Sequence, residues 1–61
     1  MTTTTHYTVW TDSGKLYEIR YFSGSYNVTT PSDGHIGESD SLALALALIM
    51  ADSGSTIDSI R

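Results

Sequence analysis

The sequence has no cysteine, only one proline and only three lysine or arginine residues among its 61 residues. The absence of cysteine excludes disulfide bonds and thiolate metal sites, which often support chains of this size. A single domain of this length buries a small core and is marginally stable. We therefore expect support from a partner protein or a second copy.

Acidic residues outnumber basic ones by seven to three, which gives a formal net charge of −4. Nucleic-acid affinity comes largely from lysine and arginine placed on phosphates. The charge balance argues against a nucleic acid as the partner and favours a neutral or basic protein.

No apolar run is long enough to span a membrane, since the longest, residues 42–51, is about half of the roughly 20 residues required. The start, MTTTTHY, lacks the basic and apolar segments of a secretory signal, so a cytoplasmic location is expected. The run from Thr2 to Thr5 is polar, which predicts a frayed lead over residues 1–5 before a single domain at 6–61.

Two segments rich in aromatic and β-branched residues, HYTVWTD and KLYEIRYF, predict a β-hairpin closed by Gly14 in a three-residue loop. This loop places Tyr7 opposite Ile19 and Val9 opposite Tyr17. One face of the hairpin then gathers its uncharged residues, Tyr7, Val9, Tyr17, Ile19 and Tyr21. A two-residue loop would instead pair Trp10 with Tyr17 and turn the first strand over.

A third strand is predicted at YNVTT, residues 26–30, and Pro31 ends it. Tyr26 and Val28 share the face of Ile19 if the preceding loop has an even number of residues, either Ser23-Gly24 or Gly24-Ser25. Residues 31–40 are interpreted as a loop.

Leucine and alanine alternate from Leu42 to Leu48, as they would in a strand, but both are strong helix formers and poor strand formers. Ser39, Asp40 and Ser41 are candidate N-cap residues and Gly54 is a candidate C-cap. We predict a helix over about 39–53. The predicted fold is α+β, a three-stranded antiparallel meander with one helix packed on it. The tail adds a short fourth strand through Ile57, or covers the helix with Ile57 and Ile60.

At 100° per residue, one stripe of this helix contains Leu42, Leu46, Ile49 and Met50. A second apolar face lies opposite and contains Leu44, Ala47, Leu48 and Ala51. A sheet covers only one face of a helix, so the second face is a candidate partner or dimer interface. The alternative is that the tail or the loop folds over it.

The sheet face away from the helix is a possible second surface, formed by Trp10, Phe22, Glu18 and Arg20 beside Leu16. Aromatic residues on such a face stack bases in some small β domains, where lysine and arginine surround them. Here Glu18 and Arg20 surround them, which favours plain packing or a protein contact.

Four residues in the predicted loop, Asp33, His35, Glu38 and Asp40, are possible metal ligands or acid and base groups. They match no EF-hand or zincin spacing. A solvated loop with a helix cap is the favoured interpretation. No catalytic residue, metal site or cofactor is predicted, and the protein is not expected to be an enzyme.

The layout of three strands followed by Gly37, Glu38 and Ser39 and by alanines at 43, 47 and 51 resembles the HicB antitoxin family, in its partial ribonuclease-H-like domain. The resemblance covers Tyr7 to Ala51 in layout and only the part from Gly37 onward in residues. It differs from that family in the apolar outer face of the helix and in lacking a proline-rich motif before the glycine. In size and order the chain is also similar to small phage-encoded inhibitors of bacterial defence. Both resemblances imply a binder of another protein.

The sequence thus predicts a small, acidic, non-catalytic protein-binding module, expected to be a homodimer and an antitoxin-like or anti-defence inhibitor of a larger protein. The alternative is a nucleic-acid-binding sheet that uses the exposed aromatic residues.

Salt dependence separates these two functions. We expect no measurable binding of the purified chain to single-stranded or duplex DNA or RNA at low salt, measured by fluorescence anisotropy. Binding that weakens steeply as salt rises would contradict this expectation and favour the nucleic-acid alternative.

Overall fold

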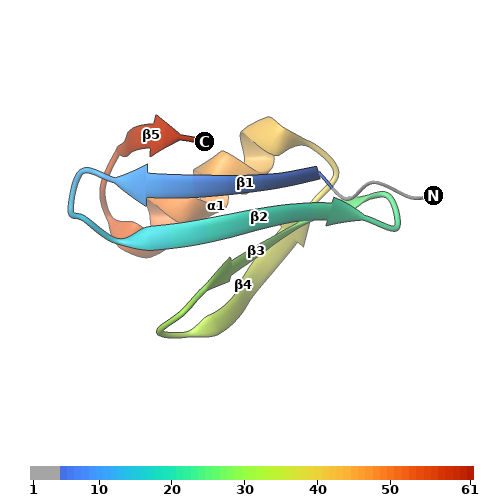
Figure 1. The fold of residues 1–61 in the computed structure, drawn as a ribbon, viewed down its shortest axis with the longest axis horizontal. Coiled ribbons are helices and arrows are strands. Elements are labelled where there is room, and N and C mark those ends of the chain that lie inside the picture. Colours follow the sequence, from blue (N-terminus) through green and yellow to red (C-terminus); the bar gives the residue numbers. More distant parts are fainter. Residues whose placement is uncertain (1–4) are drawn as a thin grey trace.

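The computed structural model describes residues 5–61, which form one five-stranded antiparallel sheet with one helix on one face (Figure 1). The elements in chain order are β1 (Thr5–Thr11), β2 (Leu16–Phe22), β3 (Ser25–Thr30), β4 (Gly34–Ser39), α1 (Leu42–Ser53) and β5 (Ile57–Ile60). The strand order across the sheet is β4-β3-β2-β1-β5. The α+β class is therefore confirmed, with more strands than the sequence predicted.

The first hairpin has the predicted register. Tyr7 lies opposite Ile19 and Val9 lies opposite Tyr17, and the backbone N–H of Gly14 bonds to the carbonyl of Thr11 in the turn. Gly14 has φ 84°, the left-handed conformation that closes such a loop. Residues 1–4 of the expected frayed lead lie outside the described residues. Thr5, the last residue of that lead, already pairs with Tyr21.

The turn between β2 and β3 consists of Ser23 and Gly24, so the even loop is confirmed. Both residues have positive φ, 53° and 80°, as in the two-residue turns whose twist matches that of an antiparallel pair. Val28 consequently lies opposite Ile19, and the two side chains point to the same face as Val9.

The interpretation of residues 31–40 as a loop is wrong for Gly34–Ser39, which form β4 on the free edge of β3. The segment lacks the alternation of a half-buried strand, but β3 supplies hydrogen-bond partners and α1 packs against the pair. Gly37 pairs with Val28 and His35 pairs with Thr29, and a β-bulge leaves Ile36 as the extra residue between these two pairs.

The tail forms the edge strand β5, which decides between the two alternatives for residues 55–61. Val9 pairs with Ile60 and Thr11 with Ile57, with a bulge between the two pairs. Arg61 extends this pairing, because its backbone N–H and carbonyl bond to Thr8 at 2.8 and 2.7 Å.

Helix α1 begins at Leu42, about three residues later than predicted, because Ser39 still belongs to β4. Ser41 is the N-cap, and its hydroxyl accepts a hydrogen bond from the N–H of Leu44 at 3.2 Å. Gly54 ends the helix as predicted, with φ 69° and its N–H on the carbonyl of Met50 at 2.9 Å.

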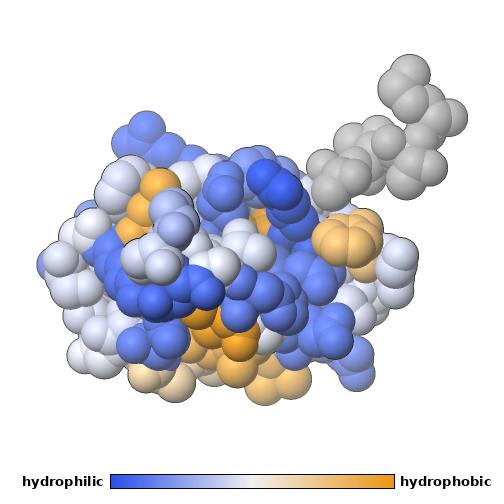
Figure 2. Space-filling model, turned by 90° about the horizontal axis from the view of Figure 1, so that it is seen from below, coloured by the Kyte–Doolittle hydropathy of each residue, from blue (hydrophilic) through white to orange (hydrophobic). Residues whose placement is uncertain are grey.

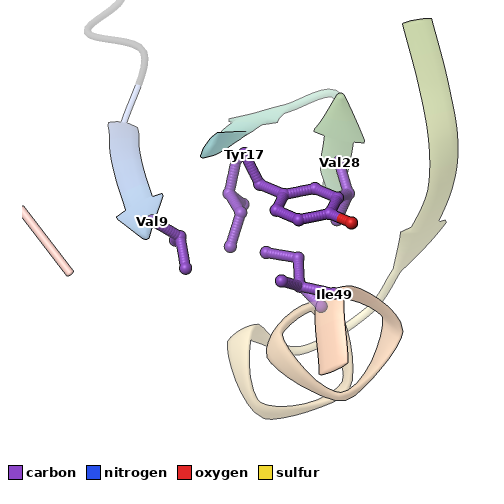
Figure 3. Packing of buried hydrophobic residues seen from close by; sticks show 6 residues of the cluster. Val9, Tyr17, Val28 and Ile49 are labelled. Atoms are coloured by element: carbon purple, nitrogen blue, oxygen red, sulfur yellow. The ribbon is translucent and has the colours of Figure 1, made fainter. Parts of the chain in front are cut away.

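The core lies between α1 and the sheet and is centred on Ile49 (Figure 3). Its fully buried apolar members are Val9, Tyr17, Ile19, Val28, Ala45 and Ile49. The predicted inner stripe of the helix needs one correction, because Met50 is 39% exposed and Ala45 is buried. The reason is the position of the helix over β3 and β4, where the small Ala45 side chain faces the sheet.

Two substitutions in α1 test this placement. Replacing buried Ile49 with alanine should cost about 2–5 kcal/mol of unfolding free energy, because it leaves a cavity in the core. Replacing exposed Leu44 with alanine, also a strong helix former, should change it by less than about 1 kcal/mol. Urea unfolding followed by circular dichroism measures both, and similar costs for the two variants would contradict the orientation of the helix.

Candidate functional site

The outward side of α1 carries five exposed apolar residues, Ala43, Leu44, Ala47, Met50 and Ala51, which we call the outer helix face. Leu44 is 58% exposed, the most of any large apolar residue in the described part of the chain. No residue from 42 to 51 is polar. Three of the four predicted interface residues, Leu44, Ala47 and Ala51, therefore lie together on this face.

Leu48, the fourth predicted interface residue, lies at the border of the outer helix face and is half-buried against the core. A β-carbon at Gly37 would lie 3.3 Å from Cδ1 of Leu48, so β4 and the helix touch at this glycine. The sequence prediction missed this contact because it took residues 31–40 for a loop, and β4 is the strand that covers this flank of the helix.

Figure 2 views the molecule from the side on which β4 forms the edge of the sheet. Hydrophobic side chains gather in a band toward the lower border of this view, whereas hydrophilic side chains cover most of the rest. Within residues 5–61 the surface forms no pocket. The site is a convex apolar ridge.

The structure does not bring the aromatic residues of the second predicted surface together. Trp10 lies opposite Leu16 at one end of the sheet, and Phe22 lies opposite Ser25 at the other end of β2. Leu16 and Phe22 are six residues apart on β2, or about 20 Å at 3.3 Å per residue. The exposed rings, 40% for Trp10 and 51% for Phe22, therefore form no continuous stacking surface.

The charged members of this second surface lie between the two aromatic rings. Glu18 accepts a hydrogen bond from Nε2 of His6 at 3.1 Å, and the guanidinium of Arg20 lies 3.9 Å from the other carboxylate oxygen. The negative charge of Glu18 and the positive charge of Arg20 lie side by side and largely cancel. This part of the sheet therefore has little net positive charge to attract a phosphate backbone.

The four possible ligands of the predicted loop are dispersed. Asp33 lies in the turn before β4, His35 and Glu38 belong to β4, and Asp40 follows it. In residues 5–61 no group of three or more histidine and acidic side chains comes close enough to hold a metal ion.

A polar cluster that the sequence did not predict joins the end of α1 to β2. The hydroxyl of Tyr17, whose ring is buried in the core, donates a hydrogen bond of 2.5 Å to Oδ2 of Asp52. Lys15 Nζ lies 3.4 Å from the carboxylates of both Asp52 and Asp33, and 5.3 Å from the centre of the Tyr17 ring. Tyr17 and Asp52 are 35 residues apart, so no local pattern signals their contact.

The contacts in this cluster shift three pKa values. The hydrogen bond from Tyr17, and then Lys15, lowers the pKa of Asp52 below its usual 3.8. Burial, and then the bond to Asp52, raises the pKa of Tyr17 above 10.0. Tyr17, with Asp33 and Asp52, raises the pKa of Lys15 to about 12. These shifts keep Asp52 ionised and Tyr17 and Lys15 protonated at neutral pH. The contacts of Asp52 with Tyr17 and Lys15 join the end of the helix to β2 and the turn before it.

Comparison with protein-family models, with curated proteins and with solved structures finds no match to this chain. In the described range, 5–61, no helix is both long and apolar enough to cross a membrane. Function must therefore be argued from the surface itself.

The Asp52 contact predicts a particular response to acid. Because the pKa of Asp52 is lower in the folded chain than in the unfolded chain, its stabilising effect is present above about pH 3.8 and is lost as the pH falls through the lowered value. The melting temperature of Tyr17→Phe, which keeps the ring but not the hydroxyl, should lie below that of the wild type at pH 7.

The same difference in melting temperature between wild type and Tyr17→Phe should shrink as the pH falls below 3.8. Tyr26→Phe is the matched control, since its hydroxyl makes no hydrogen bond within residues 5–61. Equal melting temperatures for Tyr17→Phe and wild type at pH 7 would show that the cluster does not hold the helix end.

Proposed function

We propose that this protein is a small, acidic, non-catalytic protein-binding module that acts by occupying a surface of a larger protein, in the manner of an inhibitor. One observation carries the proposal. The outer helix face is an uninterrupted apolar surface at which Leu44 is 58% exposed. Trp, Met and Leu side chains scattered singly on a surface need no explanation, but a contiguous apolar patch marks an interaction site.

The energetics of the fold support an intermolecular role for Leu44. Fully burying a leucine side chain gains about 1.5–3 kcal/mol, and the chain's own fold obtains little of this from Leu44. Ala43, Ala47 and Ala51 surround it and keep the backbone of the helix accessible, so a partner can approach closely. If another chain buries the outer helix face, the apolar surface of Leu44 leaves water, and the complex gains the hydrophobic free energy that folding alone does not provide.

An inhibitory role also agrees with the resemblance in layout to the HicB antitoxins and in size to small phage-encoded inhibitors. The homodimer expected from the sequence would bury the same outer helix face, so a second copy and a larger protein exclude each other there. The nucleic-acid alternative loses support because Trp10, opposite Leu16, and Phe22 lie beside opposite ends of β2. The cytoplasmic location stays a prediction.

Leu44→Glu tests the proposal, with Phe22→Glu as a control that adds the same charge on the opposite face of the sheet. We expect both variants to stay folded, with unfolding free energies within about 1 kcal/mol of the wild type, because both side chains are exposed. The proposal departs here from the homodimer that the sequence predicts: if a larger protein occupies the outer helix face, we expect the purified wild type to be a monomer by sedimentation across a dilution series. Leu48 is left unchanged because it is half-buried against Gly37.

Two outcomes would contradict the proposal. If Leu44→Glu unfolds while Phe22→Glu does not, the chain itself covers the outer helix face. If the wild type is a dimer that Leu44→Glu dissociates, the face belongs to a second copy.

A further inference from the structure

One aspartate of the chain is followed by glycine, and this pair lies in an exposed turn. Asp33 precedes Gly34, whereas a serine follows each of the other aspartates, Asp12, Asp40, Asp52 and Asp58. Asp33 ends the turn of residues 31–33 between β3 and β4, and Gly34 is the first residue of β4 (Figure 1). The difference matters because an aspartyl side chain can react with the backbone nitrogen of the next residue, and a side chain on that residue obstructs the reaction.

Gly34 leaves the approach to its backbone nitrogen open. Its φ is 78°, in the left-handed region that glycine adopts without strain. Apart from the two chain neighbours of Gly34, no heavy atom of residues 5–61 lies within 4 Å of the place where a β-carbon would stand. Neither a side chain of its own nor a packed neighbour therefore crowds this residue.

The Asp33 side chain is free to move toward that nitrogen. It is 57% exposed, and within residues 5–61 its carboxylate makes one contact, 3.4 Å from Nζ of Lys15. An exposed ion pair of this kind does little to hold a side chain in one position. The carboxylate of Asp52 differs, because it accepts a bond of 2.5 Å from the Tyr17 hydroxyl. Residues 31–33 are all exposed, and such turns open locally at a low cost in free energy.

We propose that Asp33-Gly34 is a site of spontaneous aspartate isomerisation in the folded protein. The backbone nitrogen of Gly34 attacks Cγ of Asp33 in its carboxylic acid form. The N–Cγ bond forms and the Cγ–OH bond breaks, so that the hydroxyl group and the proton of the amide nitrogen leave as water. The product is a five-membered succinimide ring.

One water molecule then opens this ring in either of two ways. Addition at Cγ breaks the new N–Cγ bond and restores aspartate. Addition at the main-chain carbonyl carbon of Asp33 breaks its bond to the nitrogen of Gly34 and leaves isoaspartate. One water is released and one is consumed, so the reaction needs no oxidant, reductant or second substrate. The site and its chemistry do not depend on the proposed function.

Isoaspartate at position 33 changes the link between β3 and β4. The backbone then runs through Cβ and Cγ of this residue, which lengthens it by one carbon atom, and the free carboxylate moves to the α-carbon. Thr30 pairs with Gly34 at this end of the hairpin, and Lys15 contacts the carboxylate that moves. Both contacts are disturbed. Because β4 also contacts Leu48 of the helix at Gly37, the isoaspartate form unfolds at a lower temperature.

Oxygen-18 labelling of the full chain tests the proposal, because each opening of the ring takes up one oxygen atom from water. The folded protein is kept at mildly acidic pH in heavy-oxygen water, returned to ordinary water and cleaved after glutamate. Cleavage at Glu18 and Glu38 gives a peptide of residues 19–38, which contains Asp33 and no other aspartate, and peptides 1–18 and 39–61, which contain the other four. We expect peptide 19–38 to gain heavy oxygen at least about tenfold faster per aspartate, because glycine leaves the attacking nitrogen unhindered.

Three comparisons separate the effect of the sequence from that of the fold. Asp33→Asn forms the same ring with release of ammonia, so its peptide 19–38 should gain heavy oxygen faster than that of the wild type. Asp33→Ser forms no such ring, and its peptide should gain none. A synthetic peptide of residues 29–38 gives the rate without the fold, and we expect the rate in the folded chain to lie within about tenfold of it.

Two further measurements identify the product and its effect. An isoaspartyl methyltransferase should transfer labelled methyl groups to peptide 19–38 of the incubated protein. The isoaspartate form, separated by chromatography, should melt at a lower temperature than fresh protein, whereas incubated Asp33→Ser should melt as fresh Asp33→Ser does.

Heavy oxygen and methyl label confined to peptide 19–38 support the site. Label in the synthetic peptide but none in the folded chain overturns the proposal, because the turn then prevents closure of the ring. Label spread evenly over the five aspartates overturns it as well. Equal melting temperatures of the isoaspartate form and fresh protein contradict the disturbed link between β3 and β4.

Discussion

The contact of Ile49 and Ala45 with the sheet is the interaction on which the rest of this molecule depends. Val9, Ile19 and Val28 come from three different strands and meet the helix at this one place. Without disulfides, this small core must position α1 by packing, assisted at the helix end by the bond from Tyr17 to Asp52. The position of α1 then decides which of its apolar residues remain outside.

An apolar helix on one sheet cannot bury all of its surface. The sheet covers the side that contains Ala45 and Ile49, β4 covers the flank that contains Leu48, and Leu44 remains exposed. Within residues 5–61 no helix covers the opposite face of the sheet, which is largely polar between Trp10 and Phe22. The molecule is therefore asymmetric, with one apolar ridge and one polar sheet face, and the ridge is where association with another chain gains most.

Charge and strand geometry act together to limit which partners suit this ridge. Bulges at both edges of the sheet disfavour strand addition, and the net charge of −4 disfavours an acidic partner. Neither effect is large alone, since exposed charges are screened and contribute about 1 kcal/mol or less per pair. Binding strength at the ridge would come from the apolar contact, and the net charge would act only against acidic partners.

Local sequence determined the first three strands, their register, the helix caps at Ser41 and Gly54 and the presence of a second apolar helix face, because each follows from turn chemistry, side-chain period or propensity. Tertiary structure alone decided the rest. Gly34–Ser39 became the strand β4 because β3 offered a free edge to pair with. The tail became β5 because β1 offered the free edge on the other side of the sheet. Leu48, expected to be exposed, is half-buried, and Met50, expected to be buried, is exposed. The burial of a helix residue depends on where the neighbouring strands lie, and helical periodicity carries no information on that. The bond between Tyr17 and Asp52 joins residues far apart in sequence, so only the folded chain brings them together.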